Sequence, residues 1–100
     1  MNLKMDKNAD GSALTVFIEG SIDTVTAPAL EEELNRQCEG VKELTLDFAK
    51  VDYVSSAGLR VLMGADQQMS ESGKMILKNV NEDVREVFEM TGFDELLNIE

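Results

Sequence analysis

The segment VDYVSSAGLRVL, residues 51–62, stands where the loop after a predicted strand turns into a predicted helix. The strand is LTLDF, residues 44–48, and the helix extends over residues 57–72, where apolar side chains recur every three or four residues. Two consecutive serines, Ser55 and Ser56, lie where the helix begins. A strand followed closely by an amphipathic helix is typical of an α/β fold, and the flanking sequence continues this alternation.

The sequence upstream of this segment predicts a β-hairpin. Residues 1–6 alternate apolar and polar side chains, and residues 14–19 are mostly β-branched or apolar. The intervening residues 8–11, NADG, are typical turn residues, and Gly20 is expected to close the second strand.

A first helix is predicted between this hairpin and the third strand. Thr26 is its expected N-cap, and Pro28 lies in the first turn, where a missing N–H group costs nothing. Val25 and Leu30 occupy the two positions of a hydrophobic staple. Gly40 is expected to end this helix.

Two further elements follow the helix at 57–72. Residues 75–80 predict a fourth strand, and Asn81 is the expected N-cap of a third helix that ends at Gly92. The apolar segment at 93–99 follows, and its pattern does not decide between helix and strand.

The alternation of strands and helices after the hairpin predicts crossover connections and therefore a partly parallel sheet. A chain of 100 residues suffices for one modest core. The expected fold class is α/β: a single small domain over residues 1–100 with a mixed β-sheet of roughly four to five strands, packed by roughly three to four amphipathic helices.

The composition narrows the chemistry that the chain can perform. It has no His and one Cys, Cys38, so it lacks the pairs that activate a serine or cysteine nucleophile and the usual zinc ligands. Cys38 falls on the apolar stripe of the first helix, which favours a core residue over a reactive thiol. Only carboxylate pairs remain, and these arise by chance in so acidic a chain. We therefore expect no enzyme activity, no metal site and no cofactor.

Charge and hydropathy exclude several classes of partner. Nine Lys and Arg against twenty Asp and Glu give a formal net charge of −11, which opposes direct binding to nucleic acid. No apolar run is long enough to predict membrane insertion. A single cysteine fits a reducing cytoplasm, and mutual repulsion at this net charge favours a monomer.

The paired serines have two interpretations from the residues alone. A serine here can simply cap the helix by accepting a hydrogen bond from a free backbone N–H group. With Ser55 as the N-cap, Val54 and Leu59 fall on the staple positions. Ser56 then becomes the first helical residue, and its free hydroxyl lies in a potential that favours an anion, as a phosphoryl acceptor requires.

The residues after the serines are small, which bears on what can approach them. Ala57 and Gly58 are expected to leave room for another protein, or a phosphate, to come close to the backbone. The same residues also fit an ordinary helix start, so the pattern alone does not decide between the two interpretations.

The segment at 51–62 resembles the signature of the STAS domain family, in particular of the bacterial anti-sigma factor antagonists. Four other stretches agree with this family in order and spacing, so the resemblance extends over nearly the whole chain. They are GSID at 20–23 with residues 24–30, LTLDF at 44–48, the strand at 77–80, and VFEMTGF at 87–93. The resemblance implies a small mixed sheet packed by helices, as the periodicity does.

The resemblance also implies a function. In this family the unphosphorylated antagonist binds an anti-sigma factor and so frees a sigma factor. The anti-sigma factor is often a serine kinase that phosphorylates the serine at the start of the second helix, and a serine phosphatase resets the switch. That serine matches Ser56, because Gly58 and Leu59 follow it at the family spacing. Many members carry Asp and Ser or Thr where this chain has Ser55 and Ala57.

The resemblance implies a partner-binding surface around the phosphorylated serine. Asp23, which follows a predicted strand, is expected either to line this surface or to stabilise its own turn. The family also contains scaffolds that are never phosphorylated, so the alternative function is a constitutive subunit of a lipid-transport ATPase or another transporter. The implied contact residues are Ser55, Ser56, Ala57, Gly58, Leu59 and Asp23.

Overall fold

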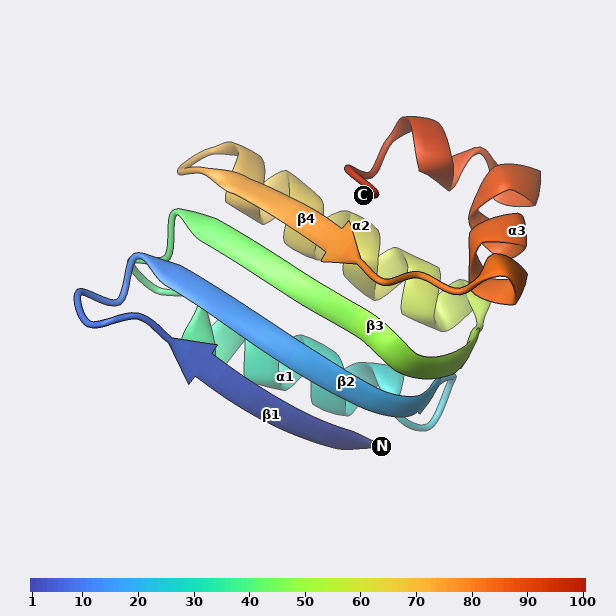
Figure 1. Cartoon of the computed structure of the whole chain (residues 1–100), viewed down its shortest axis with the longest axis horizontal. Coiled ribbons are helices and arrows are strands. Elements are labelled where there is room, and N and C mark those ends of the chain that lie inside the picture. The colour runs from blue at the N-terminus through green and yellow to red at the C-terminus, as the bar shows by residue number, and fades with distance from the viewer.

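The computed structural model describes residues 1–100 and contains one mixed sheet of four strands in the order β1-β2-β3-β4 (Figure 1). β1 pairs antiparallel with β2, whereas β2, β3 and β4 run parallel to one another. The predicted α/β class, with a hairpin followed by crossover connections, is confirmed. The strands are β1 Asn2–Lys7, β2 Ala13–Ile22, β3 Glu43–Val54 and β4 Lys74–Lys78.

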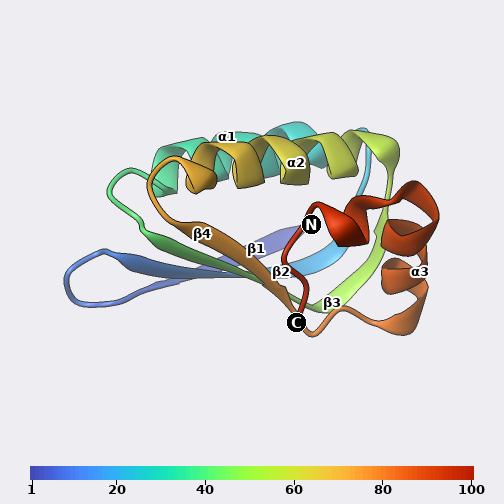
Figure 2. The same ribbon diagram turned by 90° about the horizontal axis from the view of Figure 1, so that it is seen from above.

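Two helices lie side by side on one face of the sheet, and a third stands at its end (Figure 2). The pair is α1, Ala27–Gln37, and α2, Ser56–Ser70. The third is α3, Glu82–Thr91, followed by the short 3₁₀ helix η1, Phe93–Glu95. α3 lies at the end of the sheet where β3 ends and α2 begins (Figure 2).

The core lies between the α1–α2 pair and the sheet, where 22 buried residues form one apolar cluster. β2 shows how the sheet divides its side chains between its two faces. Leu14, Val16 and Ile18 are at most 2% exposed, whereas Phe17 between them is 40% exposed. No helix covers the face on which Phe17 lies (Figure 2). The sheet therefore packs on one side only.

β2 and β3 are longer than the predicted strands. Gly20, which was expected to close the second strand, lies within β2 at a φ of +107°, a conformation that favours glycine, and β2 continues to Ile22. β3 extends over residues 43–54 instead of 44–48. The pairing of β2 with β3 shifts register twice, and such bulges interrupt the two-residue alternation from which strand length is predicted.

The chain enters α1 through a reciprocal capping box on the preceding turn. Asp23 Oδ1 accepts hydrogen bonds from the N–H groups of Val25 at 2.9 Å and Thr26 at 3.0 Å. Thr26 Oγ1 in turn accepts from the Asp23 N–H group at 2.9 Å. The Ala27 N–H group then donates to the Asp23 carbonyl oxygen at 2.8 Å. Asp23 is thus the first residue of the box. Thr26 directly precedes α1, as predicted for its N-cap, but its side chain makes no capping bond to the helix. Asp23 supplies the capping oxygen instead.

The positions of the hydrophobic staple are counted from the capping residue, so a cap at Asp23 changes them. Val25 is 85% exposed, so the predicted staple between Val25 and Leu30 is wrong. A cap at Asp23 instead assigns the staple positions to Ile22 and Ala27. Both are buried, at 0% and 2% exposure, and they fix the angle at which the chain leaves β2 for α1.

The predicted ends of α3 are confirmed. Asn81 Oδ1 accepts from the Val84 N–H group at 2.9 Å, as an N-cap should, and Gly92 ends the helix at a φ of +79°. Asn81 Nδ2 also donates to the Val51 carbonyl oxygen at 2.8 Å. One side chain thus both caps α3 and attaches it to the last part of β3.

The segment at 93–99, whose type the sequence did not decide, combines η1 with a return to the sheet. The Leu77 N–H group donates to the Asn98 carbonyl oxygen, and the Glu100 N–H group donates to the Leu77 carbonyl oxygen, both at 2.9 Å. β4 ends at Lys78, two residues short of the predicted end, where Asn79 takes a φ of +60°.

Three features of the structure concern the membrane, metal and thiol chemistry considered from the sequence. None of the helices is both long and apolar enough to cross a membrane. No group of three or more His, Cys, Asp or Glu side chains is placed to hold a metal ion. Cys38 at the end of α1 is half-buried against the core, and burial raises the pKa of its thiol, as expected of a core residue.

The capping box generates a prediction about pH. The N–H groups of Thr26 and Val25 bind the Asp23 carboxylate and hold its pKa below its ordinary value. A lowered folded-state pKa adds stability above the unfolded pKa and loses it as the pH falls through the folded pKa. We expect the wild type to melt at a higher temperature than Asp23→Asn at pH 7, with a difference that shrinks below about pH 4.

Thermal melts followed by circular dichroism from pH 7 to pH 2.5 measure this difference. Asp23→Asn keeps an acceptor oxygen but loses the charge, whereas Asp23→Ala loses both and should stay less stable than the wild type throughout. An equal difference between the wild type and Asp23→Asn at both ends of the range would contradict a role for the carboxylate charge.

Candidate functional site

Ser55 caps α2, as the sequence predicted. Its backbone is extended, and its Oγ accepts from the Gly58 N–H group at 3.3 Å. The Leu59 N–H group donates to the Ser55 carbonyl oxygen at 2.9 Å, which closes the first turn of the helix. Val54 and Leu59, on the predicted staple positions, are only 2% and 5% exposed. Local sequence signals therefore fix where α2 begins.

Ser56 is the first residue of α2, and its side chain is exposed. Its hydroxyl makes no hydrogen bond within the chain, because the capping bond is made by Ser55. The hydroxyl lies where unpaired N–H groups and the helix dipole favour negative charge. Ser56 is thus free to accept a group from another protein, and the helix end can hold the resulting anion.

Gly58 is needed because the start of α2 packs against the ends of β2 and β3. A Cβ atom at Gly58 would lie 2.8 Å from Ile22 Cγ2, 2.9 Å from the Ile22 carbonyl oxygen and 3.0 Å from Val54 Cγ1. The missing side chain therefore makes room for the chain's own strands. The expectation that Gly58 leaves room for a partner is wrong, because that space is filled from within.

The residues expected to bind a partner divide into two groups. Leu59, at 5% exposure, and Gly58 are buried in the free protein, and their contact with a partner stays a prediction. Ser56 is exposed, and Ser55 and Ala57 are half-buried. The surface available around the start of α2 is therefore small and centred on Ser56.

Asp23 lies beside this surface but has a structural role. The Ser55 N–H group donates to the carbonyl oxygen of Ile22 at 2.8 Å, so the turn after β2 adjoins the start of α2. Asp23 is the next residue on that turn, and its Oδ1 is bound by the backbone N–H groups of the capping box. Of the two roles expected for Asp23, turn stabilisation is confirmed by these bonds.

Two exposed apolar side chains at this end of the sheet were not predicted. Val25, in the turn after β2, is 85% exposed, and Tyr53, two residues before Ser55, is 53% exposed. Between these segments, Ser21 Oγ donates to Asp52 Oδ1 at 2.8 Å. Strand alternation assigns only one of Asp52 and Tyr53 to the open face, and the register shift in β3 exposes both.

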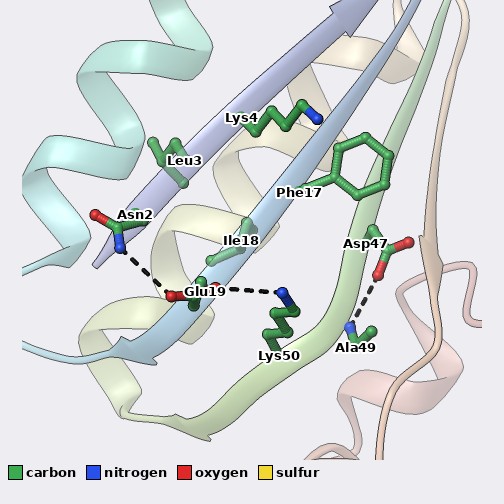
Figure 3. A pocket seen from close by; sticks show the side chains of 9 residues that line it. All are labelled: Asn2, Leu3, Lys4, Phe17, Ile18, Glu19, Asp47, Ala49 and Lys50. Atoms are coloured by element: carbon green, nitrogen blue, oxygen red, sulfur yellow. Dashed lines mark hydrogen bonds and ion pairs between the residues drawn. The ribbon is translucent and has the colours of Figure 1, made fainter.

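The open face of the sheet contains a separate hollow of about 440 Å³ (Figure 3). Lys4, Phe17 and Asp47 lie across neighbouring strands at its rim. Most of its charges already have partners: Lys50 pairs with Glu19 at 3.6 Å, and Asp47 Oδ1 accepts from the Ala49 N–H group at 2.9 Å. The hollow therefore presents no set of free groups comparable to the unpaired Ser56 hydroxyl.

Known proteins match this chain over nearly its whole length. The STAS domain family model matches residues 4–100. BtrV of Bordetella bronchiseptica, a candidate anti-sigma factor antagonist, is 40% identical over 93% of this chain and 80% of its own length. The anti-sigma-B factor antagonist of Bacillus subtilis is 30% identical over 99% of this chain and 92% of its own length.

The fold is also that of a solved antagonist. The anti-sigma factor antagonist SpoIIAA in its unphosphorylated form superposes with a TM-score of 0.82 at 16% identity, over 99% of this chain and 88% of that one. Bacillus SpoIIAA in its phosphorylated form gives a TM-score of 0.73 at 15% identity, over 99% and 91% of the two chains. At such low identity the likeness establishes the shared fold.

The close packing at Gly58 predicts opposite effects for two glycine substitutions in α2. Gly58→Ala should destabilise the fold by about 1–3 kcal/mol, because the new methyl group overlaps Ile22 and Val54. Gly64→Ala is the matched control: a Cβ there meets nothing within 4 Å, and alanine favours the helix by roughly 0.5–1 kcal/mol. Urea denaturation measures both, and equal changes in unfolding free energy would show that Gly58 is not tightly packed.

Alanine substitutions of the two serines should also differ in their effect on stability. Ser55→Ala removes the N-cap and should lower the free energy of unfolding by about 0.5–2 kcal/mol, towards the lower end because the bond to Gly58 is long at 3.3 Å. Ser56→Ala should change it by less than about 0.5 kcal/mol, since its hydroxyl has no partner in the chain. The same urea titrations test this pair, and a larger loss for Ser56→Ala would reverse the assignment of the cap.

Proposed function

Because the chain belongs to the STAS domain family, we propose that it is an anti-sigma factor antagonist. The Bacillus subtilis relative of that name supports the proposal, since the two sequences align over 99% of this chain. On this proposal the protein is a bacterial, cytoplasmic regulator that binds an anti-sigma factor and thereby frees a sigma factor. It has no enzyme activity of its own and acts through what it binds.

The observation that carries the proposal is the exposed Ser56 hydroxyl at the first position of α2. Ser55 makes the capping bond, so modification of Ser56 does not remove a bond that the fold needs. We therefore propose that Ser56 is phosphorylated and that the phosphorylated protein is released from its partner. The neighbouring N–H groups of the helix start support a phosphate at this position.

The chain supplies only the acceptor for this modification. In the transfer, Ser56 Oγ forms a bond to the γ-phosphorus of ATP, the bond from that phosphorus to the bridging oxygen of ADP breaks, and the kinase takes the hydroxyl proton. The base and the metal ion belong to the kinase, which we propose is the anti-sigma factor itself. A separate serine phosphatase would restore the hydroxyl by hydrolysis.

The surface around Ser56 favours control by a phosphate. Val25 and Tyr53 present apolar area at the same end of the sheet, and Ala57 is small and half-buried. We propose that this surface contacts the anti-sigma factor, with Gly58 and Leu59 supporting it from the core. A phosphate carrying about −1.5 to −2 charges then has to be desolvated within a close-packed interface. A loss of about 3 kcal/mol weakens binding roughly 150-fold, enough to exchange partners.

This proposal predicts how charge at Ser56 affects binding. Affinity purification of the native protein first identifies the partner, and calorimetric titration then measures its affinity. Ser56→Asp should bind that partner more weakly than the wild type, with an unchanged circular dichroism spectrum. Protein phosphorylated at Ser56 should lose roughly 100-fold or more in affinity.

Ser56→Ala is the control, because it removes the acceptor without adding charge and should bind like the wild type. It should incorporate no phosphate from the partner and ATP, whereas Ser55→Ala should still incorporate it. Equal affinity of the unphosphorylated and phosphorylated proteins would refute the switch. Recovery of transporter subunits in place of an anti-sigma factor would instead favour the constitutive scaffold.

A further inference from the structure

The start of α2 is nearly uncharged, and its one charge lies next to Ser56. Although 29% of the residues in the chain are charged, residues 56–65, SAGLRVLMGA, contain only Arg60. The exposed residues along this part of the helix are Ser56, Arg60 and Gly64, each four residues from the next. They form one row on the helix surface, in which Arg60 is the only long side chain.

Arg60 has no partner in the unmodified protein. The ion pairs of the structure engage Arg36, Lys50 and Lys78 but not Arg60. Side chains in an α-helix lean towards its N-terminus, so the turn that begins with Ser56 lies within reach of the Arg60 side chain. Gly64, the next residue in the row, has no side chain to draw it the other way.

We infer that Arg60 binds the phosphate on Ser56, an inference that rests on the proposed phosphorylation of that serine. An anion four residues before a cation is the favourable order on a helix, and a phosphate on Ser56 also lies at the N-terminal end of α2, which favours an anion. A guanidinium group offers two parallel N–H donors to phosphate oxygens, which a lysine ammonium cannot do.

The other charged groups at this end of the molecule make Arg60 the available counter-charge. Asp23 follows β2 and Asp52 lies near the end of β3, and both are acidic. Glu82 and Asp83 in the first turn of α3 add two more acids. Among the cations, Lys78 at the end of β4 lies 3.8 Å from Glu100, and Arg85 belongs to α3. The N-terminal ammonium group of Met1 lies close enough to Asp23 to lower the pKa of that carboxyl group. Arg60 is the cation on the same helix as Ser56, one turn along it. Tyr53 is a further titratable group at this end of the sheet.

The inference adds a second element to the switch. Before phosphorylation the guanidinium group is free to pair with a carboxylate of the partner. After phosphorylation it turns to the phosphate, so the partner meets a new anion and at the same time loses a cation. One modification thereby reverses the sign of the charge that the start of α2 presents.

The inference is tested on protein in which phosphoserine is incorporated at position 56 during translation, so that no kinase is needed. The second ionisation of the phosphate, which lies near pH 6, is followed by phosphorus NMR. Because Arg60 stabilises the dianion, the pKa of this step should be about 0.3 unit lower in the wild type than in Arg60→Gln. Arg60→Lys should restore part of the shift, and added salt should reduce it.

Arg36→Gln is the matched control, because it removes the same charge from the last turn of α1, whereas Ser56 adjoins the turn that precedes α1. It should leave the phosphate pKa as in the wild type. The acids near Ser56 are present in every variant, so their effect on the phosphate cancels in the comparison. A second measurement follows the Nε–H signal of Arg60, which should shift as the phosphate becomes dianionic. Equal phosphate pKa values in Arg60→Gln and Arg36→Gln, or an unmoved Arg60 signal, would overturn the inference. Partner binding by the same phosphoprotein is measured separately, so the proposed function stands or fails independently.

Discussion

The backbone N–H group of Ser55 donates to the carbonyl oxygen of Ile22 over 2.8 Å, and the whole site depends on this contact. The bond joins the end of β2 to the start of α2, although these segments are far apart in the chain. It is possible only because Gly58 has no side chain to hold α2 away from Ile22. Once it forms, the turn that contains Asp23 must lie beside Ser56. The exposed serine, the apolar Val25 and the capping box thus share one location.

Structural features that depend on residues three or four positions apart could be predicted from the sequence. Features that depend on contacts between distant segments could not. Ser55 and Asn81 were identified as helix caps because a cap needs only its own side chain and one nearby N–H group. At the start of α1 the predicted N-cap, Thr26, does directly precede the helix, but the capping oxygen comes from Asp23. The two residues belong to one capping box, in which each accepts from the other's backbone. The sequence indicates that a capping box is present, but it does not show which residue begins the box.

The lengths of β2 and β3 and the roles of the site residues depend on contacts between distant segments. Ala57 and Gly58 look equally small in the sequence, yet packing against Ile22 buries Gly58 and leaves Ala57 half-buried. Likewise, the exposure of Tyr53 follows from a register shift between β2 and β3, which no periodicity within β3 reveals. The resemblance to a family proposes the functional segment, but only the fold separates its buried residues from its exposed ones.

On the proposed phosphorylation of Ser56, the distribution of charge explains how a single phosphate controls binding by so acidic a protein. Phosphorylation changes the net charge from −11 to about −13, a small relative change for the molecule as a whole. At the start of α2 the change is of another kind, because residues 56–65 pass from +1, the charge of Arg60, to roughly −0.5 to −1. Salt screens the distant acids beyond about 10 Å, whereas a partner in contact with Ser56 meets this local charge directly. On this proposal a partner responds to the sign of this short helical surface rather than to the total charge. For this reason the absence of other charges along the start of α2 matters as much as the serine itself.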